Sequence, residues 1–170
     1  MANFEPALAY TLKHEGGWSD DPADPGGATN YGITLKTAQR HGITTKQELK
    51  AISRYKVEAI YYADYWKFDG INNQRVATKL FDMAVNMGVT TAIILSQQVL
   101  NGEYKAALTV DGRLGPLTLA ALNNCDPAEL LEVLCLVSAE HYRAIAAARP
   151  ASQKFLKGWL KRAAEVPNAS

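Results

Sequence analysis

Hydrophobic residues recur at helical spacing along most of this chain, so the pattern predicts one helix after another. The first helix carries an apolar stripe whose members lie four residues apart: Phe4, Leu8 and Leu12. Asn3 is the predicted N-cap of this helix, and Gly16-Gly17 is its predicted end. Glu15 is therefore expected at the C-terminal end of an apolar helix face.

The segment from residue 18 to residue 34 breaks this pattern. It is dense in Pro, Gly, Asp and Asn and has no helical periodicity. We therefore expect an ordered loop that has room for a short β-hairpin. Short helices are predicted to follow, with Gln47 or Glu48 as a capping-box partner in the second, and each starts at a hydroxyl N-cap: Thr34, Thr44 or Thr45, and Ser53.

Two segments in the middle of the chain have the pattern of well-packed core helices. The first is predicted over 74–87, with an apolar stripe made of Val76, Leu80, Met83 and Met87. The second is predicted over 91–100, with Asn101-Gly102 as its end. These two helices are the candidates for the hydrophobic core.

The longest predicted helix starts at Asp126-Pro127 and ends at Arg149-Pro150, and a last helix starts at Ser152. With 170 residues the chain is long enough to bury one sizeable core. No internal repeat or low-complexity linker divides it. We therefore expect a single compact unit, with an N-terminal region of residues 1–100 and a C-terminal helical region of residues 101–170.

Hydrophobic residues make up 48% of the chain and charged residues 21%, which is the balance of a soluble globular protein. The net charge of +1 is too small to favour nucleic acid or an anionic membrane as the main partner. Residues 1–6 lack the features of a secretory signal, and no stretch has the length of a membrane span. We therefore expect a protein that stays in the cytoplasm after synthesis, without stable membrane insertion.

The cysteines and histidines do not predict a disulfide or a metal site. A mostly helical segment separates Cys125 from Cys135 and would place them roughly 12 Å apart, so two free thiols are expected. His14, His41 and His141 are far apart and lack the spacing of metal ligands. We expect neither a metal nor another cofactor.

Glu15 is the strongest candidate for chemistry. A carboxyl that continues an apolar face and precedes two glycines can line a cleft where the loop leaves the helix. Partial desolvation and the negative end of the helix dipole both favour its protonated form. Such a group suits general acid catalysis near neutral pH. The alternative is a solvated glutamate at a helix end.

The loop that follows offers the second carboxyl that glycoside hydrolysis needs across the scissile bond. The candidates are Asp20, Asp21 and Asp24, and Asp24 is preferred because it precedes Pro25-Gly26-Gly27, a tight turn leading back towards the first helix. All three aspartates have an alternative explanation as turn or cap residues. Thr29 supplies a hydroxyl that can hold a water molecule.

Three blocks of sequence carry a family resemblance, and together they span nearly the whole chain: residues 15–18 with 24–34, residues 81–88, and residues 110–122. The first two resemble the N-acetylmuramidases of glycoside hydrolase family 108, made by phages and prophages. The third is similar to the peptidoglycan-recognition segment that usually follows in this family. The resemblance implies a mainly α, lysozyme-like fold with a small irregular loop or β-hairpin after the first helix.

The resemblance also assigns roles to residues. It matches Glu15 to the family's glutamate, and the order of Glu15, Asp24 and Thr29 resembles the acid, carboxylate and hydroxyl of phage-type lysozymes. Residues 31–34 depart from the Gly-Tyr-Gly-His that those lysozymes often show, and the family often has Tyr where this chain has Trp. The residues expected to bind substrate are Trp18, Tyr31, Asp82 and Asn86.

Other residues have both a structural and a functional interpretation. The segment from Asp111 to Leu122 reads as a tight loop and a short helix, with either a structural or a binding role, and Arg113 is either a ligand for a stem-peptide carboxylate or a solvated charge. Aromatic residues after Ser53 form either core or a sugar-stacking wall: Tyr61, Tyr62, Tyr65 and Trp66. Trp159 and Arg162 are interpreted as packing and a surface charge.

The function that the resemblance implies is a cofactor-free lysozyme, which is bacteriolytic because it cleaves the MurNAc-β-1,4-GlcNAc bond of peptidoglycan strands. A monomer is expected, waiting in the host cytoplasm until a holin opens the way to the periplasmic cell wall during phage-type lysis. One alternative is a lytic transglycosylase, which needs one glutamate and gives an anhydro sugar. Another is a non-catalytic wall-binding or secretion-accessory protein. The stereochemical outcome depends on the distance between the two carboxyls.

Overall fold

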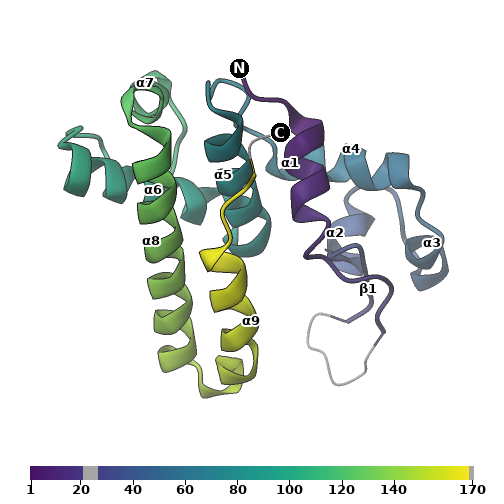
Figure 1. The fold of residues 1–170 in the computed structure, drawn as a ribbon. Helices are drawn as coiled ribbons and strands as arrows, with labels where there is room; N and C mark the ends of the chain where they lie inside the picture. Colours follow the sequence, from purple (N-terminus) through teal and green to yellow (C-terminus); the bar gives the residue numbers. More distant parts are fainter. Residues whose placement is uncertain (21–26, 169–170) are drawn as a thin grey trace.

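The computed structural model describes residues 1–20 and 27–168, and helices dominate it, which confirms the mainly α fold (Figure 1). A short antiparallel pair of strands lies near the N-terminus. In chain order the elements are α1 (Phe4–Thr11), β1 (Thr29–Asn30), β2 (Ile33–Thr34), α2 (Leu35–Gln39), α3 (Lys46–Lys50), α4 (Arg54–Tyr65), α5 (Gln74–Met87), α6 (Val89–Tyr104), α7 (Pro116–Asn124), α8 (Pro127–Ala148), the 3₁₀ turn η1 (Pro150–Ser152) and α9 (Gln153–Ala164).

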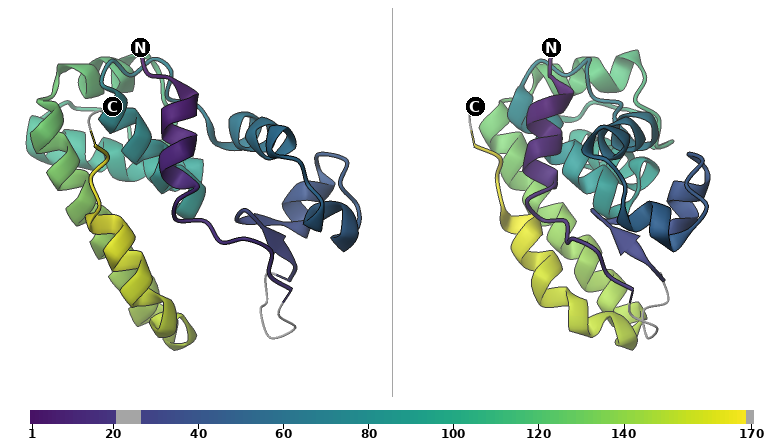
Figure 2. Two further views of the ribbon diagram at one scale, coloured as in Figure 1. Left: turned by 45° about the vertical axis from the view of Figure 1, so that its right-hand side comes forward. Right: turned by 90° about the vertical axis from the view of Figure 1, so that its right-hand side faces the viewer.

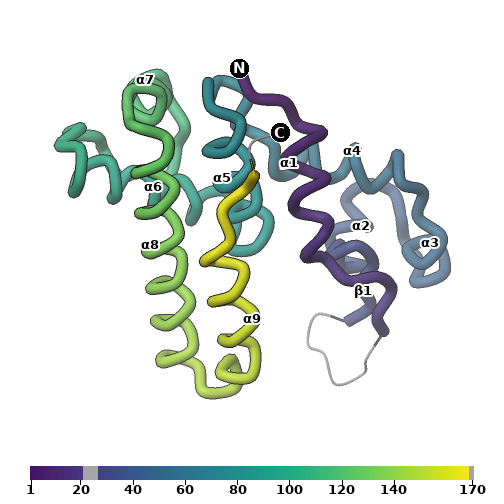
Figure 3. The backbone as a smooth tube through the Cα atoms, in the orientation of Figure 1, coloured from purple at the N-terminus to yellow at the C-terminus, as the bar shows by residue number. Residues whose placement is uncertain are grey.

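Helix α5 forms the centre of the core. Every residue from Val76 to Ala84 is buried, and α5 packs against α1, α6 and α8 (Figure 3). The predicted apolar stripe explains only part of this burial, because polar residues of the same helix are buried as well: Thr78, Lys79 and Asp82. Buried polar groups need partners, so this side of α5 must meet other polar groups of the fold.

Gly88 separates α5 from α6. Its φ of +94° is one that side-chain-bearing residues rarely adopt, and it ends α5 where the sequence predicted. The prediction of 91–100 for the next helix was too short. Asn101 and Gly102, interpreted as the end, lie inside α6, which ends only at Lys105 in the left-handed conformation with a φ of +52°.

Helices α8 and α9 run side by side and are joined by the turn η1 (Figure 2). The predicted start of α8 is confirmed, because the Asp126 side chain accepts hydrogen bonds from the N–H groups of Ala128 and Glu129. Pro127 occupies the first position of the helix, where no backbone donor is needed. As a result α9 returns along α8 towards α5.

Helix α1 is shorter than predicted. It ends at Thr11, and the N–H groups of Lys13 and His14 then bond to carbonyls three residues back, which tightens the chain into a turn. Glu15 therefore lies beyond the helix. Asn3 occupies the N-cap position as predicted, but its side chain makes no cap bond, and the Asn3 backbone instead exchanges two hydrogen bonds with the side chain of Gln74.

The predicted β-hairpin is present, with Thr29 opposite Thr34 and Asn30 opposite Ile33. Its two-residue turn has a φ of +50° at Tyr31 and +72° at Gly32, the signs of a type I′ turn. The Asn30 side chain donates to the carbonyls of two residues at the end of α3: Leu49 and Lys50. Thr34 caps α2 as predicted, and Thr45 with Glu48 forms the capping box of α3.

Cys125 and Cys135 are both free thiols, as expected. Within residues 1–20 and 27–168, no helix has the length and apolar character needed to cross a membrane. The same residues contain no group of three or more His, Cys, Asp or Glu side chains placed to hold a metal ion.

Candidate active site

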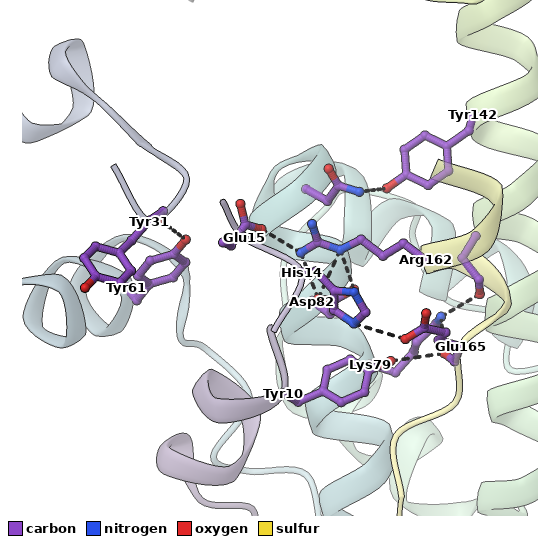
Figure 4. A network of polar contacts seen from close by, with 12 residues as sticks. Tyr10, His14, Glu15, Tyr31, Tyr61, Lys79, Asp82, Tyr142, Arg162 and Glu165 are labelled. Atoms are coloured by element: carbon purple, nitrogen blue, oxygen red, sulfur yellow. Dashed lines mark hydrogen bonds and ion pairs between the residues drawn. The ribbon is translucent and has the colours of Figure 1, made fainter. Parts of the chain in front are cut away.

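Glu15 lies where the chain leaves α1 and turns towards the β-hairpin (Figure 4). Its side chain is 15% exposed, so the carboxyl is largely shielded from solvent. Oε1 lies 2.9 Å from Nη2 of Arg162, in the last turn of α9. Oε2 faces Gly32, in the hairpin turn. The carboxyl is thus enclosed between two segments far apart in the sequence.

The hairpin turn approaches Glu15 so closely that residue 32 has to be glycine. A Cβ atom built on Gly32 would collide with Oε2 of Glu15, and it would lie 2.8 Å from Cδ of Glu15 and 3.0 Å from Oη of Tyr61. Oη of Tyr61 donates a 2.7 Å hydrogen bond to the carbonyl of Tyr31. Burial, followed by the charge of Glu15, raises the pKa of Tyr61, so this hydroxyl keeps the proton it donates.

Replacing Gly32 by Ala is expected to lower the catalytic activity by about 100-fold, because the new methyl group would displace the Glu15 carboxyl. The matched control is Gly42→Ala. Gly42 also has a positive φ, of +81°, but no atom lies within 4 Å of a Cβ built on it. Turbidity clearing measures activity, and urea unfolding measures the backbone strain that both variants share. Equal losses of activity in the two variants would contradict the close approach as the cause.

Arg162 bridges two carboxylates. Its Nη2 lies 2.9 Å from Oδ1 of Asp82 and 2.9 Å from Oε1 of Glu15, and its Nε lies 3.1 Å from Oδ2 of Asp82. The exposed fractions of the three side chains are 13% for Arg162, 4% for Asp82 and 15% for Glu15. Asp82 and Arg162 therefore form a buried, two-pronged ion pair that touches Glu15 on one side.

The interpretation of Arg162 as a surface charge was wrong. Burial acts to lower its pKa, but the hydrogen bond and charge of Asp82 and the charge of Glu15 outweigh burial and raise it, so the guanidinium stays charged. The sequence contained one signal for such a partner. Lys79 and Asp82 lie three residues apart in the stretch 76–84, whose other residues are apolar except for Thr78, and buried charges are found paired or hydrogen-bonded.

The end of α9 is fixed to the first half of the chain by further contacts (Figure 4). The buried Lys79 of α5 donates to the carbonyls of Ala163 and Glu165, at 2.7 and 2.9 Å. Nε2 of His14 lies 3.2 Å from the Glu165 carboxylate, and Oη of Tyr10 is hydrogen-bonded to the Glu165 carbonyl. A lysine at helix-terminal carbonyls is favourably placed in the helix dipole. Arg162 is thereby held in position next to Glu15.

The other predicted catalytic residues lie in or near the hairpin. Thr29 is half-buried in β1, where its backbone pairs with Ser19 and Thr34. Asp24, the preferred second carboxylate, lies outside the described residues. Asp20, an alternative, is bound by Nζ of Lys46 at 2.8 Å. The catalytic roles of Asp24 and Thr29 stay predictions.

The predicted substrate-binding residues fall in three different surroundings. Trp18 and Tyr31 are half-buried against the core, and Nζ of Lys50 lies 5.8 Å from the centre of the Trp18 ring. Asp82 is buried, and both of its oxygens are taken by Arg162. Asn86 lies one turn beyond Asp82 on α5, half-buried, and donates to Oη of Tyr142 at 2.6 Å. Sugar binding by these residues stays a prediction.

A pocket of about 270 Å³ adjoins the ion pair. It is lined by His14, Asn86, Gly158, Trp159, Lys161, Arg162 and Glu165. The ring of Trp159 stacks on Tyr142 with centroids 5.2 Å apart, so packing is confirmed as one role of Trp159. Polar side chains and an aromatic edge in one small pocket suit a sugar ring.

The aromatic stretch of α4 is mainly core. Tyr61 and Trp66 are buried, at 1% and 6% exposure, whereas Tyr62 is 56% exposed. Trp66 makes edge-to-face contacts with three phenylalanine rings: Phe4, Phe68 and Phe81. Of the two interpretations, the structure supports core packing for Tyr61 and Trp66.

The loop around Asp111 is organised by one buried side chain. Oε1 of Gln97 accepts from the N–H groups of Asp111 and Gly112, while Nε2 of Gln97 donates to Asp111 Oδ1 and the Arg113 carbonyl. Hydrogen bonds, first from Gln97 and then from the Arg113 N–H, lower the pKa of Asp111. The aspartate thus has a structural role. Arg113 is exposed beside a second pocket of about 270 Å³.

Comparisons with known proteins agree with this geometry. Residues 8–88 match the family model described as Glycosyl hydrolase 108, and residues 91–164 match the model described as Predicted Peptidoglycan domain. Among solved structures, the chain is similar to Brucella abortus SagA, with 28% sequence identity, a TM-score of 0.74, and 98% of this chain and 97% of that chain covered. No curated protein sequence matches the chain significantly.

These matches confirm the family resemblance and the lysozyme-like fold, and they support a peptidoglycan hydrolase with glycosidase activity. The two matched segments meet near Gly88, where α5 ends and α6 begins. Residue 100, the expected boundary between regions, lies inside α6. A division of the chain at that residue stays a prediction.

Proposed function

We propose that this chain, whose residues 8–88 belong to the glycosyl hydrolase 108 family, is a lysozyme that hydrolyses the bond between N-acetylmuramic acid and N-acetylglucosamine. The observation that carries the proposal is the enclosure of the Glu15 carboxyl, with Oε1 on Arg162 and Oε2 at the hairpin turn. A general acid needs a fixed position and limited access to bulk water. Glu15 has both.

In the proposed mechanism Glu15 protonates the glycosidic oxygen that leaves C1 of N-acetylmuramic acid. Asp24 stabilises the developing oxocarbenium ion, or orients a water molecule together with Thr29. The pairing of Asp20 with Lys46 supports the choice of Asp24 over Asp20, because Asp20 already has a cationic partner. Asp21 remains the alternative second carboxylate.

Substrate contacts are proposed for side chains on both sides of Glu15. Trp18 and Tyr31 offer ring faces near the hairpin, and Asn86 offers an amide in the pocket beside Arg162. The burial of Asp82 and its pairing with Arg162 support a change of role. We propose that Asp82 holds Arg162 and does not contact the sugar directly.

The test is mass spectrometry of the muropeptides released from peptidoglycan, with reducing ends labelled after digestion. A lysozyme is expected to give reducing N-acetylmuramic acid ends. Products lighter by one water, with anhydro ends, would assign a lytic transglycosylase. New N-acetylglucosamine reducing ends would place the cut at the other glycosidic bond, and an absence of products would indicate a non-catalytic wall-binding protein.

We further propose that the enzyme acts during phage-type lysis and reaches the periplasmic wall after a holin has opened the membrane. Its support is the resemblance of the motifs at residues 15–18 and 24–34 to those of phage and prophage muramidases. Bacteria that express the chain alone are expected to grow normally and to lyse within minutes of chloroform treatment. Lysis of growing cells without any permeabilising agent would overturn this part of the proposal.

A further inference from the structure

Three ionisable side chains share the site: Glu15, Asp82 and Arg162. Their charges sum to zero only when Glu15 is protonated. Arg162 carries one positive charge, and Asp82, nearly fully buried, carries one negative charge. The pair is therefore neutral by itself. If Glu15 is ionised, the cluster carries a net charge of −1, and if Glu15 is protonated, the cluster is neutral. Because each side chain is at most 15% exposed, water screens such a charge poorly.

We propose that the Asp82–Arg162 pair controls both the position and the retention of the catalytic proton of Glu15. Arg162 makes Oε1 an acceptor, which leaves the proton on Oε2. Asp82 cancels the charge of Arg162, so the guanidinium does not draw the proton away from Glu15. The inference rests on the proposed function, because it assigns a role to the proton that Glu15 donates.

The assignment of the proton to Oε2 follows from the chemistry of arginine. A guanidinium has N–H donors and no acceptor, so the carboxyl oxygen that contacts it has to accept. Oε1 lies 2.9 Å from Nη2 of Arg162 and is that acceptor. A protonated Glu15 thus places its O–H on Oε2, on the side of the hairpin turn. Arg162 acts in this scheme as a positioning residue.

The need for Asp82 follows from the charge of Arg162. A guanidinium that faced Glu15 alone would form a neutral pair with the ionised carboxylate and would oppose the protonated form. Asp82 prevents this, because it accepts hydrogen bonds from both Nε and Nη2 of Arg162, whereas Glu15 contacts only Nη2. Arg162 therefore binds Asp82 more strongly than it binds Glu15. The same arginine can then hold the acid without removing its proton.

Other titratable groups surround the cluster but have partners of their own or stay neutral. His14 pairs with Glu165, and Lys79 binds backbone carbonyls at the end of α9. Burial raises the pKa of each nearby tyrosine, so these groups are uncharged near neutral pH: Tyr10 on α1, Tyr61 and Tyr65 on α4, and Tyr142 on α8. Within the described part of the chain, no further charged side chain lies within ion-pair distance of the cluster.

Arg162 comes from the segment that matches the peptidoglycan domain, whereas Glu15 and Asp82 come from the segment that matches the hydrolase family. The C-terminal segment therefore completes the catalytic centre as well as adding a wall-binding region.

The test is the pH dependence of peptidoglycan clearing by the full chain. The alkaline limb of this profile reports loss of the proton from the general acid. Asp82→Asn leaves Glu15 as the sole anion facing Arg162 and is expected to move the limb to lower pH by about one to two units. Arg162→Gln leaves Asp82 as a bare negative charge near Glu15 and is expected to move the limb to higher pH by a similar amount.

Two further variants keep the test decisive if a single substitution disturbs folding. The double variant Asp82→Asn/Arg162→Gln is neutral at both positions, so its limb is expected within about half a pH unit of the parent's, since no charge is added or removed overall. Arg162→Lys keeps the charge, and its limb is expected to stay where it is. Arg75→Gln is the matched control, since Arg75 donates to the carbonyl of Pro167, in the segment that follows α9, without touching Glu15.

Opposite shifts in the two single variants support the inference, and a purely structural ion pair would not produce them. The inference would be overturned if both alkaline limbs moved in the same direction, or if both stayed at the parent's pH while the activity fell. Glu15→Gln separates this failure from a failure of the proposed function. If that variant is inactive while the limbs do not move, only the role of Asp82 and Arg162 is lost, and if it is active, Glu15 is not the acid.

Discussion

Glu15→Gln is expected to lower the rate of peptidoglycan hydrolysis by about 10²- to 10⁴-fold, because an amide has no proton to give to the leaving oxygen. The substitution keeps the shape of the side chain, and the amide oxygen can still accept from Nη2 of Arg162. The fold should therefore be preserved, as urea unfolding can verify. Zymography on peptidoglycan and initial rates of turbidity clearing measure the loss of activity.

Glu5→Gln is the control for this experiment. Glu5 carries the same side chain on the exposed surface of α1, near the start of the helix, and lies away from the site. Its substitution is expected to leave clearing unchanged. Comparable clearing by the parent and by Glu15→Gln would remove Glu15 from the mechanism.

The second large effect concerns stability. Arg162→Met is expected to lower the free energy of unfolding by about 3–5 kcal/mol, because Asp82 then stays buried without a cationic partner. Asp82→Leu is expected to cost less, since Arg162 keeps Glu15 as a partner. The double variant Asp82→Leu/Arg162→Met should cost less than the sum of the two, because apolar side chains replace both charges. Urea denaturation of the four proteins gives the double-mutant cycle.

The pair of Arg54 and Glu58 on α4 provides the reference for this cycle. It has a similar contact distance, 2.8 Å, but both side chains are about half exposed. Arg54→Met is expected to change the free energy of unfolding by less than about 0.5 kcal/mol, as is usual for exposed pairs four residues apart in a helix. Equal costs at the two pairs would show that burial of Arg162 and Asp82 contributes nothing.

Elements encoded by local chemistry could be predicted from the sequence. The bounds of α5 follow from Asn73 and Gly88, and the start of α8 follows from Asp126 and Pro127. The end of α1 could not be predicted, because apolar spacing continues to Leu12 while the backbone already changes to tighter hydrogen bonds. Element ends without a cap residue depend on the surrounding packing, which a local pattern does not contain.

The same distinction applies to the site. Glu15 stood out by its place at the end of an apolar stripe and before two glycines, and the hairpin was indicated by its turn-forming residues. Arg162 did not stand out, since one arginine in a polar last turn looks like any solvated charge. Its partners lie 80 and more positions away in the sequence, and only the folded arrangement of α5, α9 and the turn after α1 brings them together.

The origin of the arginine in α9 limits how this protein can be recombined. A chimera that joined residues 1–90 to a foreign wall-targeting module would keep the acid and the hairpin, yet it would lose the guanidinium that pairs with Asp82 and the helices that pack against α5. Exchange of modules, in the laboratory or during evolution, therefore has to preserve α5 and α9 as one inherited unit.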